Sequence, residues 1–463
     1  MGKPNILFIL IDDMGWKDLS CFGSDFYETP RIDKLAEEGI LFTDAYAACP
    51  VCSPTRASIL TGKYPARLGM TQWLGGHSEG KLADVPYIDH LSTNEFSLAK
   101  ALRKSGYSTL HVGKWHLSQH NEQRFSTYPD KHGFDINIGG CDWGHPFNGY
   151  FSPYGIETLD DGPEGEYLTD RLTDEAINLI NSQDKDKPWF MYLSHYAVHT
   201  PIECHAELVE KYKRKAQKLN INQEYAILEG EIFSCDHKKN ERIQRRVIQS
   251  DPVYAAMVEN LDWNTGRVID ALDHAGIRKN TIIVFFSDNG GVSTAEGSPT
   301  CNLPLAEGKG WVYEGGTRTP LIISWPGEIA SGVTCHTPLT STDFYPTLLE
   351  LCGLDLIPEQ HCDGQSLYRL LIDGEFINDR PIFWHYPHYS NQGGTPACSI
   401  RFGKWKLIEF FESTRLELYD LSVDVSEKND LARKHPDVTN QLKKMLDEWK
   451  SDVSAKIPER RYL

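Results

Sequence analysis

Short apolar runs rich in β-branched and aromatic residues alternate along the chain with longer segments whose apolar positions follow a helical period. The short runs predict buried strands, and the longer segments predict amphipathic helices. We expect strands at residues 5–11, 109–112, 189–194, 281–287 and 321–325. We expect helices at residues 95–104, 167–181, 253–275 and 342–351, with Asn94 as the N-cap of the first. This alternation is typical of an α/β fold, in which helices sandwich a large, mostly parallel sheet.

The character of the sequence changes near Ile372, where segments rich in Pro, Gly and aromatic residues replace the alternation of strands and helices. Short strands within 399–410 and at 416–421, and a closing helix near 438–450, are expected after that point. We therefore predict two parts. Residues 1–371 form the larger domain, with its site at the carboxyl ends of the strands, and residues 372–463 form a smaller α+β subdomain with a short antiparallel sheet. The charged stretch 238–246 is predicted to be a solvated surface insertion.

Composition and charge narrow the class of protein. The 463 residues are 40% hydrophobic and 24% charged, which is ordinary for a globular protein and excludes a disordered chain. No apolar run approaches the roughly 20 residues that a membrane-spanning helix needs. The formal net charge of −18 argues against nucleic acid or an anionic membrane as a partner, because the long-range field repels both. An anionic substrate would need a local positive pocket.

Cysteine usage and the start of the chain bear on its compartment. Eleven cysteines, an odd number with irregular spacing, argue against a disulfide scaffold, although Cys352 and Cys362 remain a candidate pair. The chain opens with Met1-Gly2-Lys3 directly before an apolar run, without a signal peptide. This start fits a cytoplasmic protein or an exported protein trimmed of its leader. We expect export to the periplasm or the exterior, and a cytoplasmic location stays open.

Polar residues follow four of the predicted strands, at the ends where ligands bind in open α/β sheets. These residues are Asp12, Asp13, Lys114, His116, His195, His199, Asp288 and Asn289. Three carboxylates and one amide oxygen form a ligand set that suits a hard cation such as calcium, and not zinc. The alternative is that Asp12-Asp13 caps a turn and that Asp288-Asn289-Gly290 is an Asx turn, which we favour for either motif alone. Their joint occurrence at strand ends favours a metal site.

The segment Cys52-Ser53-Pro54-Thr55-Arg56 is the strongest local signal. Ser53 is predicted as an N-cap, Pro54 as the first helical residue and Gly62 as the end of the helix. Cys52 would then lie at the positive end of the helix dipole, where an anion binds favourably. Arg56 lies one turn further along and would reach the same anion. An isolated cysteine is more often a buried structural residue, but the Pro and Arg spacing favours a site.

Cys52-x-Pro54-x-Arg56 with Thr61-Gly62 resembles the signature of the type I, formylglycine-dependent sulfatases of the alkaline phosphatase-like superfamily. Further segments resemble the same family in its usual order, at residues 4–13, 113–116, 199–201, 288–290 and 308–316. The resemblance covers nearly the whole chain. Residues 217–250 look like an insertion, which we expect to affect the choice of substrate more than the chemistry.

The resemblance implies that a maturation enzyme oxidises Cys52 to formylglycine, whose hydrate attacks the sulfur atom of a sulfate ester. It also implies one calcium ion. The implied ligands are Asp12, Asp13, Asp288, Asn289 and the modified Cys52.

The remaining catalytic roles are also implied by the resemblance. Arg56 would orient the nucleophile, and Lys114 and Lys309 would pair with sulfate oxygens. His116 would assist the nucleophile, and His199 would protonate the leaving sugar oxygen. By contrast, His195 matches no motif of the family, and we expect it to be structural.

The expected substrate is a sulfated carbohydrate, because the chain resembles bacterial exo-acting carbohydrate sulfatases. Resemblance alone suggests 4-sulfated galactose or N-acetylgalactosamine. Segment 384–394 is dense in aromatic, His and amide groups, which suit a sugar site or, alternatively, a subdomain core. The candidate substrate-binding residues are His385, His388, Asn391 and Arg401. Weaker candidates, each more often structural, are Trp73, His77, Trp143 and His145.

Two other functions compete with this reading. The first is a phosphate or phosphonate ester hydrolase, because related folds act on similar tetrahedral anions. Such enzymes commonly use two metal ions, whereas the sequence shows one ligand set. The second is a catalytically silent carbohydrate-binding protein, in which Cys52 stays a thiol.

Overall fold

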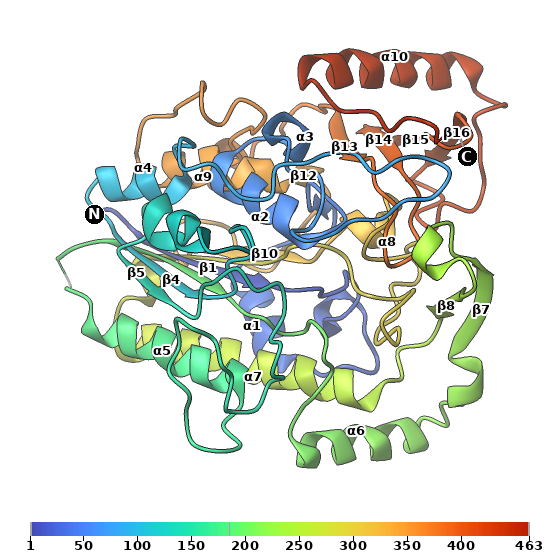
Figure 1. The fold of residues 1–463 in the computed structure, drawn as a ribbon. Coiled ribbons are helices and arrows are strands. Elements are labelled where there is room, and N and C mark those ends of the chain that lie inside the picture. The colour runs from blue at the N-terminus through green and yellow to red at the C-terminus, as the bar shows by residue number, and fades with distance from the viewer. Residues whose placement is uncertain (1, 185, 462–463) are drawn as a thin grey trace.

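The computed structural model describes residues 2–184 and 186–461 and consists of a large sheet between two layers of helices, with a smaller sheet at one end (Figure 1). The large sheet has eight strands in the order β11-β2-β10-β9-β1-β6-β4-β5. Their bounds are β1 Asn5–Ile11, β2 Ile40–Phe42, β4 Ser108–Gly113, β5 Ile136–Ile138, β6 Trp189–Ser194, β9 Thr281–Ser287, β10 Leu321–Ser324 and β11 Val333–Cys335. The strands from β9 to β5 are parallel to one another, and β10 is antiparallel to both of its neighbours. The predicted α/β fold is confirmed.

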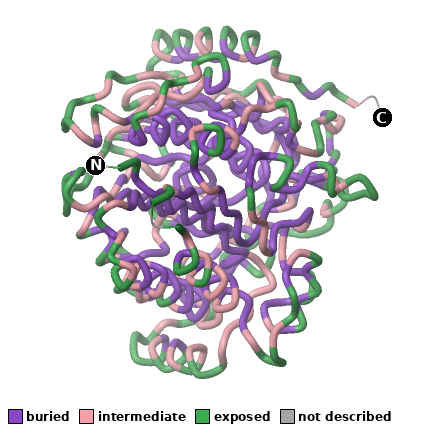
Figure 2. The backbone as a smooth tube through the Cα atoms, turned by 90° about the vertical axis from the view of Figure 1, so that its left-hand side faces the viewer, coloured by how far each residue is buried: buried purple, intermediate pink, exposed green. Residues whose placement is uncertain are grey.

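Helices cover both faces of this sheet. One layer contains α1 Pro30–Glu37, α5 Leu168–Ser182 and α7 Pro252–His274, with α6 Ala206–Lys218 packed outside α7. The other layer contains α2 Cys52–Thr61, α4 Leu98–Lys104 and α9 Phe344–Leu351. Successive side chains of β1 alternate between two cores, so that Leu7 packs on one face and Phe8 on the other. Burial on both faces explains why β1 is apolar throughout, and Figure 2 shows the central strands as the buried part of the molecule.

A four-stranded antiparallel sheet near the C-terminus carries the closing helix. It contains β13 Ile382–Tyr386, β14 Ala397–Phe402, β15 Trp405–Phe410 and β16 Arg415–Asp420, and α10 Pro436–Asp452 packs against it. The predicted 399–410 segment is therefore a hairpin that turns after Phe402. The Lys406 ammonium of β15 contacts Glu314 and Glu427, each at 2.9 Å, and the side chains of all three are fully buried. This ion cluster joins the small sheet to the helix α8 Glu314–Thr317.

Two predicted caps are wrong. Ser97, and not Asn94, caps α4, because its side chain accepts a hydrogen bond from the Lys100 N–H. Helix α2 begins at Cys52, so Ser53 lies inside the helix and does not cap it. The Ser53 hydroxyl instead accepts a hydrogen bond from the Leu74 N–H. Gly62 ends α2 in the left-handed region at φ 67°, as predicted.

Segment 217–250, which we predict to be an insertion, contains a hairpin formed by β7 Ile227–Ile232 and β8 Arg242–Arg246. The prediction that 238–246 is simply solvated is wrong in part. Ile243 packs in a small core with Trp311 and Tyr389, and Arg246 is buried. One face of β8 therefore packs on the loops that follow the large sheet.

All eleven cysteines are free thiols, so the candidate pair of Cys352 and Cys362 forms no disulfide. Within residues 2–184 and 186–461, none of the helices combines the length and the apolar character that crossing a membrane requires.

Candidate active site

The strand ends meet at one edge of the large sheet because the parallel strands are in close register. Leu10 of β1 pairs with Ser194 of β6, which in turn pairs with Gly113 of β4. Ile11 of β1 pairs with Ser287 of β9. Each following residue therefore enters the same region, and Lys114 and Asp288 also donate backbone hydrogen bonds to neighbouring strands. The convergence that the sequence predicts is present in the structure.

Two buried oxygen atoms in this region lack partners. Asp12 Oδ1 and Asn289 Oδ1 have no hydrogen-bond partner among the described residues. Burial raises the pKa of Asp12 well above its usual range, although Lys114 lies 2.6 Å from its Oδ2 atom and opposes the shift. Because an unpaired buried polar atom is costly, a ligand for these oxygens would stabilise the site. A hard cation fits, since Asp13 and Asp288 add further carboxylate oxygens beside them.

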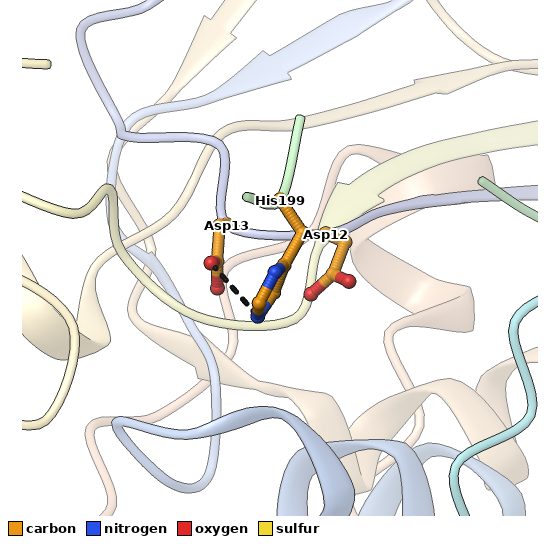
Figure 3. A group of neighbouring side chains, drawn as sticks. All are labelled: Asp12, Asp13 and His199. Carbon is orange, nitrogen blue, oxygen red and sulfur yellow. Dashed lines mark ion pairs between the residues drawn. The ribbon is translucent and has the colours of Figure 1, made fainter. Parts of the chain in front are cut away.

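Asp13 lies in a cluster with His199 and Lys309. Figure 3 shows the His199 ring pointing between Asp12 and Asp13, and one ligand atom from each of these three residues lies within 4.8 Å of the others. The Lys309 ammonium is 2.8 Å from Asp13 Oδ2 and 3.0 Å from His199 Nε2. Burial opposes ionisation of Asp13, but Lys309 and His199 outweigh it and hold the pKa of Asp13 below its usual range. His199 Nε2 faces the lysine, so the all-oxygen set remains the best match for a metal ion.

Cys52 is the first residue of α2 and lines the same cleft as His199 and Lys309. Its Sγ atom is 3.3 Å from Nδ1 of His116. Burial raises the pKa of the Cys52 thiol, and burial together with Lys114 holds the pKa of His116 well below its usual range. Both groups are therefore neutral, and an unmodified thiol is a poor nucleophile in this position. His116 and Asp13 have left-handed φ values of 53° and 61°, which non-glycine residues adopt rarely and mostly at functional sites.

Arg56 lies among the buried carboxylates of the site. Its Nε and NH2 atoms lie 2.8 and 2.7 Å from Asp288 Oδ2, and NH1 donates to Ser194 Oγ at 2.6 Å. The guanidinium is fully buried and holds a predicted metal ligand instead of facing an open cleft. Lys114 is likewise buried against Asp12, so only Lys309 of these three cations lines the cleft above Cys52.

That cleft has a volume of about 370 Å³, within the range of small-molecule sites. Its walls are mostly aromatic, apolar and His side chains, with one carboxylate and one amide. The lining residues are Cys52, Trp73, Leu74, His116, His120, Gly144, His145, Phe147, His199, Thr200, Glu296, Lys309 and Gln392. Sequence reasoning ranked Trp73 and His145 low, included Gln392 in the candidate segment 384–394 without selecting it, and missed His120, Phe147 and Glu296. These residues come from separate loops, and no local pattern distinguishes them.

The predicted sugar-binding residues do not line the cleft, and we correct that prediction. His385 and His388 are buried, and their ring nitrogens contact the Lys456 carbonyl and Asp84, respectively. Arg401 is buried against Asp44 at 2.7 Å. Asn391 is half-buried, and its carbonyl accepts a hydrogen bond from Lys238. The contacts of the first three residues belong to the interior of the small sheet and its junction with the large domain.

Comparison with known proteins gives a consistent result. The chain matches the family model described as Sulfatase over residues 4–354 and the model described as N-sulphoglucosamine sulphohydrolase, C-terminal, over residues 308–452. A sulfatase of Formosa agariphila is 31% identical over 96% of this chain and 88% of its own length. The N-acetylgalactosamine-6-sulfatase of Mus musculus is 31% identical over 87% of this chain and 71% of its own length. The solved structure of Ps i-CgsB in complex with k-i-k-neocarrahexaose has a TM-score of 0.76 and 29% identity, covering 96% of this chain and 92% of that chain.

Proposed function

This chain belongs to the sulfatase family, and we propose that it hydrolyses a sulfate ester of a carbohydrate with oxidised Cys52 as its nucleophile. The observation that carries the proposal is the position of Cys52. Cys52 begins a helix, and its Sγ atom lies 3.3 Å from His116 Nδ1. It also lines a cleft beside a cluster of buried carboxylates. An aldehyde at this position would be hydrated next to groups that bind a cation and an anion.

The modification of Cys52 explains how a site with a neutral, buried thiol can act as a nucleophile. The hydrated aldehyde supplies one hydroxyl that attacks sulfur and a second that releases sulfate by re-forming the aldehyde. The neutral His116 imidazole is placed to accept a proton from this group, because its Nδ1 atom faces the Cys52 side chain. The backbone N–H groups at the start of α2 favour negative charge at the same point.

We propose that one calcium ion is held by Asp12, Asp13, Asp288 and Asn289, with the modified Cys52 as a further ligand. The two unpaired oxygen atoms, Asp12 Oδ1 and Asn289 Oδ1, support this assignment. When bound, calcium would lower the pKa of a coordinated hydroxyl and offset charge on the sulfate group. Arg56 fixes the Asp288 carboxylate, and Lys114 fixes that of Asp12.

Proton supply to the leaving sugar oxygen is assigned to His199. Burial and the neighbouring Lys309 hold the pKa of His199 well below its usual range, so the imidazole of the free site is neutral. A sulfate group bound beside Lys309 would offset the positive field of the lysine and favour the protonated form. Lys309 itself is placed to bind a sulfate oxygen, since its ammonium lines the cleft.

For the substrate, we propose a galactose-configured sugar, either galactose or N-acetylgalactosamine, with sulfate at position 4. Position 6 is the alternative, which the name of the mouse relative supports. The similarity to Ps i-CgsB, whose structure holds k-i-k-neocarrahexaose, supports a glycan as the leaving group. A phosphate or phosphonate ester is less well supported, because the described residues contain one cluster of possible metal ligands.

The test joins two measurements. Mass spectrometry of the Cys52 peptide should find the formylglycine mass, and sulfate release should be measured from galactose 4-sulfate and from the 4- and 6-sulfates of N-acetylgalactosamine. Release should need calcium and should vanish in Cys52→Ala, whose methyl side chain carries no sulfur or oxygen to be oxidised to the aldehyde, while unfolding stays unchanged. Activity retained by Cys52→Ala would reject the nucleophile, and hydrolysis of matched phosphate esters alone would reject the sulfatase activity on sugars.

We further propose that a maturation enzyme modifies Cys52 in the producing cell and that the protein acts outside the cytoplasm. A charged, sulfated glycan does not cross a membrane unaided, which supports an exported enzyme. Fractionation of source cells would test this location, and recovery of all sulfatase protein with a cytoplasmic marker would contradict it.

A further inference from the structure

One cleft residue has a charge that the proposed mechanism does not use. Glu296 is the one carboxylate among the lining residues that the structure describes, and its side chain is exposed, unlike the buried carboxylates below it. A carboxylate in a site for a sulfated sugar would repel the anion unless it faces a different part of the substrate. Its position therefore bears on which sugars the cleft accepts.

The turn that presents Glu296 is held in an unusual backbone conformation. Glu296, Gly297 and Ser298 have successive φ values of 53°, 81° and 46° in the left-handed region. Non-glycine residues adopt this region rarely, so neighbouring contacts must hold the turn. The Ser298 hydroxyl donates to the Gln244 carbonyl at 2.7 Å, and the Arg246 side chain donates to the Ser298 carbonyl. Hairpin β7–β8 of the insertion therefore fixes the position of Glu296.

A second contact fixes the direction of the carboxylate. The Gln392 side-chain oxygen accepts a hydrogen bond from the Ser390 hydroxyl at 2.6 Å, so its NH2 group faces Glu296 and donates to Glu296 Oε1. The backbone carbonyl of Gln392 accepts hydrogen bonds from the Thr294 hydroxyl at 2.8 Å and from the Trp311 indole N–H at 3.0 Å. In the described part of the chain, Glu296 Oε2 has no hydrogen-bond partner. An ionised carboxylate only accepts, so this atom is available to a donor from a ligand.

We propose that Glu296 is a specificity-determining residue that accepts a hydrogen bond from a free hydroxyl of the substrate sugar and excludes a second anionic group at that position. This inference rests on the proposed function and narrows its substrate class to sugars with one sulfate at the reacting position and a neutral hydroxyl facing Glu296. A hydroxyl gains a charge-assisted hydrogen bond there, whereas a second sulfate meets a like charge. Gln392 and the insertion hairpin act as positioning groups for this carboxylate.

The test compares N-acetylgalactosamine 4-sulfate and 6-sulfate with the 4,6-disulfate. Binding is measured by calorimetry in a Cys52→Ala background, and turnover is measured in the full enzyme with calcium. The monosulfated sugar that binds more tightly should have an association constant about tenfold or more above that of the disulfate, because the disulfate makes one partly screened like-charge contact. Glu296→Gln keeps the shape of the side chain and should bring this ratio close to one. Glu241→Gln, on the exposed part of the insertion, makes the same change in net charge and should leave the ratio unchanged.

The binding and the turnover measurements together distinguish a failure of the inference from a failure of the proposed function. A ratio unchanged by Glu296→Gln, or no binding of any of the three sugars, would overturn the role of Glu296. A binding preference that Glu296→Gln removes, without sulfate release by the full enzyme, would support Glu296 and reject the sulfatase activity on these sugars. A loss that is equal for the mono- and disulfated sugars would show that Glu296 only positions other groups, and would also reject the inference.

Discussion

Replacement of Arg56 by Met tests whether the guanidinium holds the metal-ligand carboxylates together. Met has a similar length and removes the charge, so Asp288 would stay buried without its cation. The variant would lose the hydrogen bond from Nε to Asp288 Oδ2 at 2.8 Å, the ion pair of NH2 with the same oxygen at 2.7 Å, and the NH1 hydrogen bonds to Ser194 Oγ at 2.6 Å and the Lys114 carbonyl at 3.1 Å. Removal of one partner of a buried pair costs about 3–5 kcal/mol, because the remaining charge is uncompensated. We expect a loss of that size in the free energy of unfolding.

Chemical denaturation without calcium would measure this loss. Arg67→Met is the matched control, since Arg67 also pairs with two carboxylates, Asp363 and Asp452, but its side chain is 27% exposed. Its loss should be smaller than that of Arg56→Met, because the Arg67 guanidinium and Asp452 are in contact with water, whereas both partners of the Arg56–Asp288 pair are buried. If Arg56→Met does not fold, Arg56→Lys, which keeps the charge, is measured in its place. Its loss in the free energy of unfolding should lie between those of Arg56→Met and Arg67→Met. If Arg56→Met, or in its place Arg56→Lys, proves no less stable than Arg67→Met, the structural reason given for Arg56 is wrong.

The remaining predictions concern calcium, the proton donor and one buried histidine. Calcium at 100 times its dissociation constant should raise the free energy of unfolding of the wild type by about 2.7 kcal/mol, as measured by differential scanning calorimetry. At the same calcium concentration, the gain should be smaller in Asn289→Ala. His199→Gln should lower kcat on sugar sulfates by roughly 10²–10⁴-fold but should spare 4-nitrophenyl sulfate, whose leaving group needs no proton; equal losses on both would reject the assignment. Burial lowers the pKa of His385 to about 3, so this residue contributes stability above the unfolded pKa of about 6.5 that is lost as the pH falls below it. Relative to His385→Gln, the wild type should therefore become less stable from pH 6.5 to pH 5 in urea titrations, and parallel curves would contradict the burial argument.

The long strands and the polar residues at their ends were predictable because each signal is local. A buried parallel strand such as β1 is apolar at every position, and its register with β6 and β9 brings Asp12 and Asp288 together. The short strands β2, β5 and β11 were not predicted, since three residues are too few to show a period. The antiparallel direction of β10 also has no local signal.

The cleft walls were the least predictable part of the site. Glu296 and Gln392 are far apart in the sequence and meet only because the small sheet packs beside the loops that follow β9. The dense His and aromatic segment that contains His385 has the composition of a sugar site, but the same composition fills the interior of the small sheet. Only the packing distinguishes the two: His385 is buried away from the cleft, and both ring nitrogens of His388 contact protein groups, Asp84 and the Thr71 hydroxyl.

The arrangement of charges explains how a chain with a net charge of −18 can capture an anion. Each carboxylate of the buried cluster contacts its own cation, as Asp12 does with Lys114, Asp13 with Lys309, and Asp288 with Arg56. With all three carboxylates ionised around a bound divalent cation, these pairs are neutral in sum, so the cation would leave the floor of the cleft with excess positive charge. That charge acts at short range in a buried site, where it is weakly screened, whereas the surface charges are spread through solvent. Glu296 is an exposed residue of the same cleft and acts on Lys309 more weakly than Asp13 does, so its charge opposes a second anion while a bound cation keeps the floor of the cleft positive.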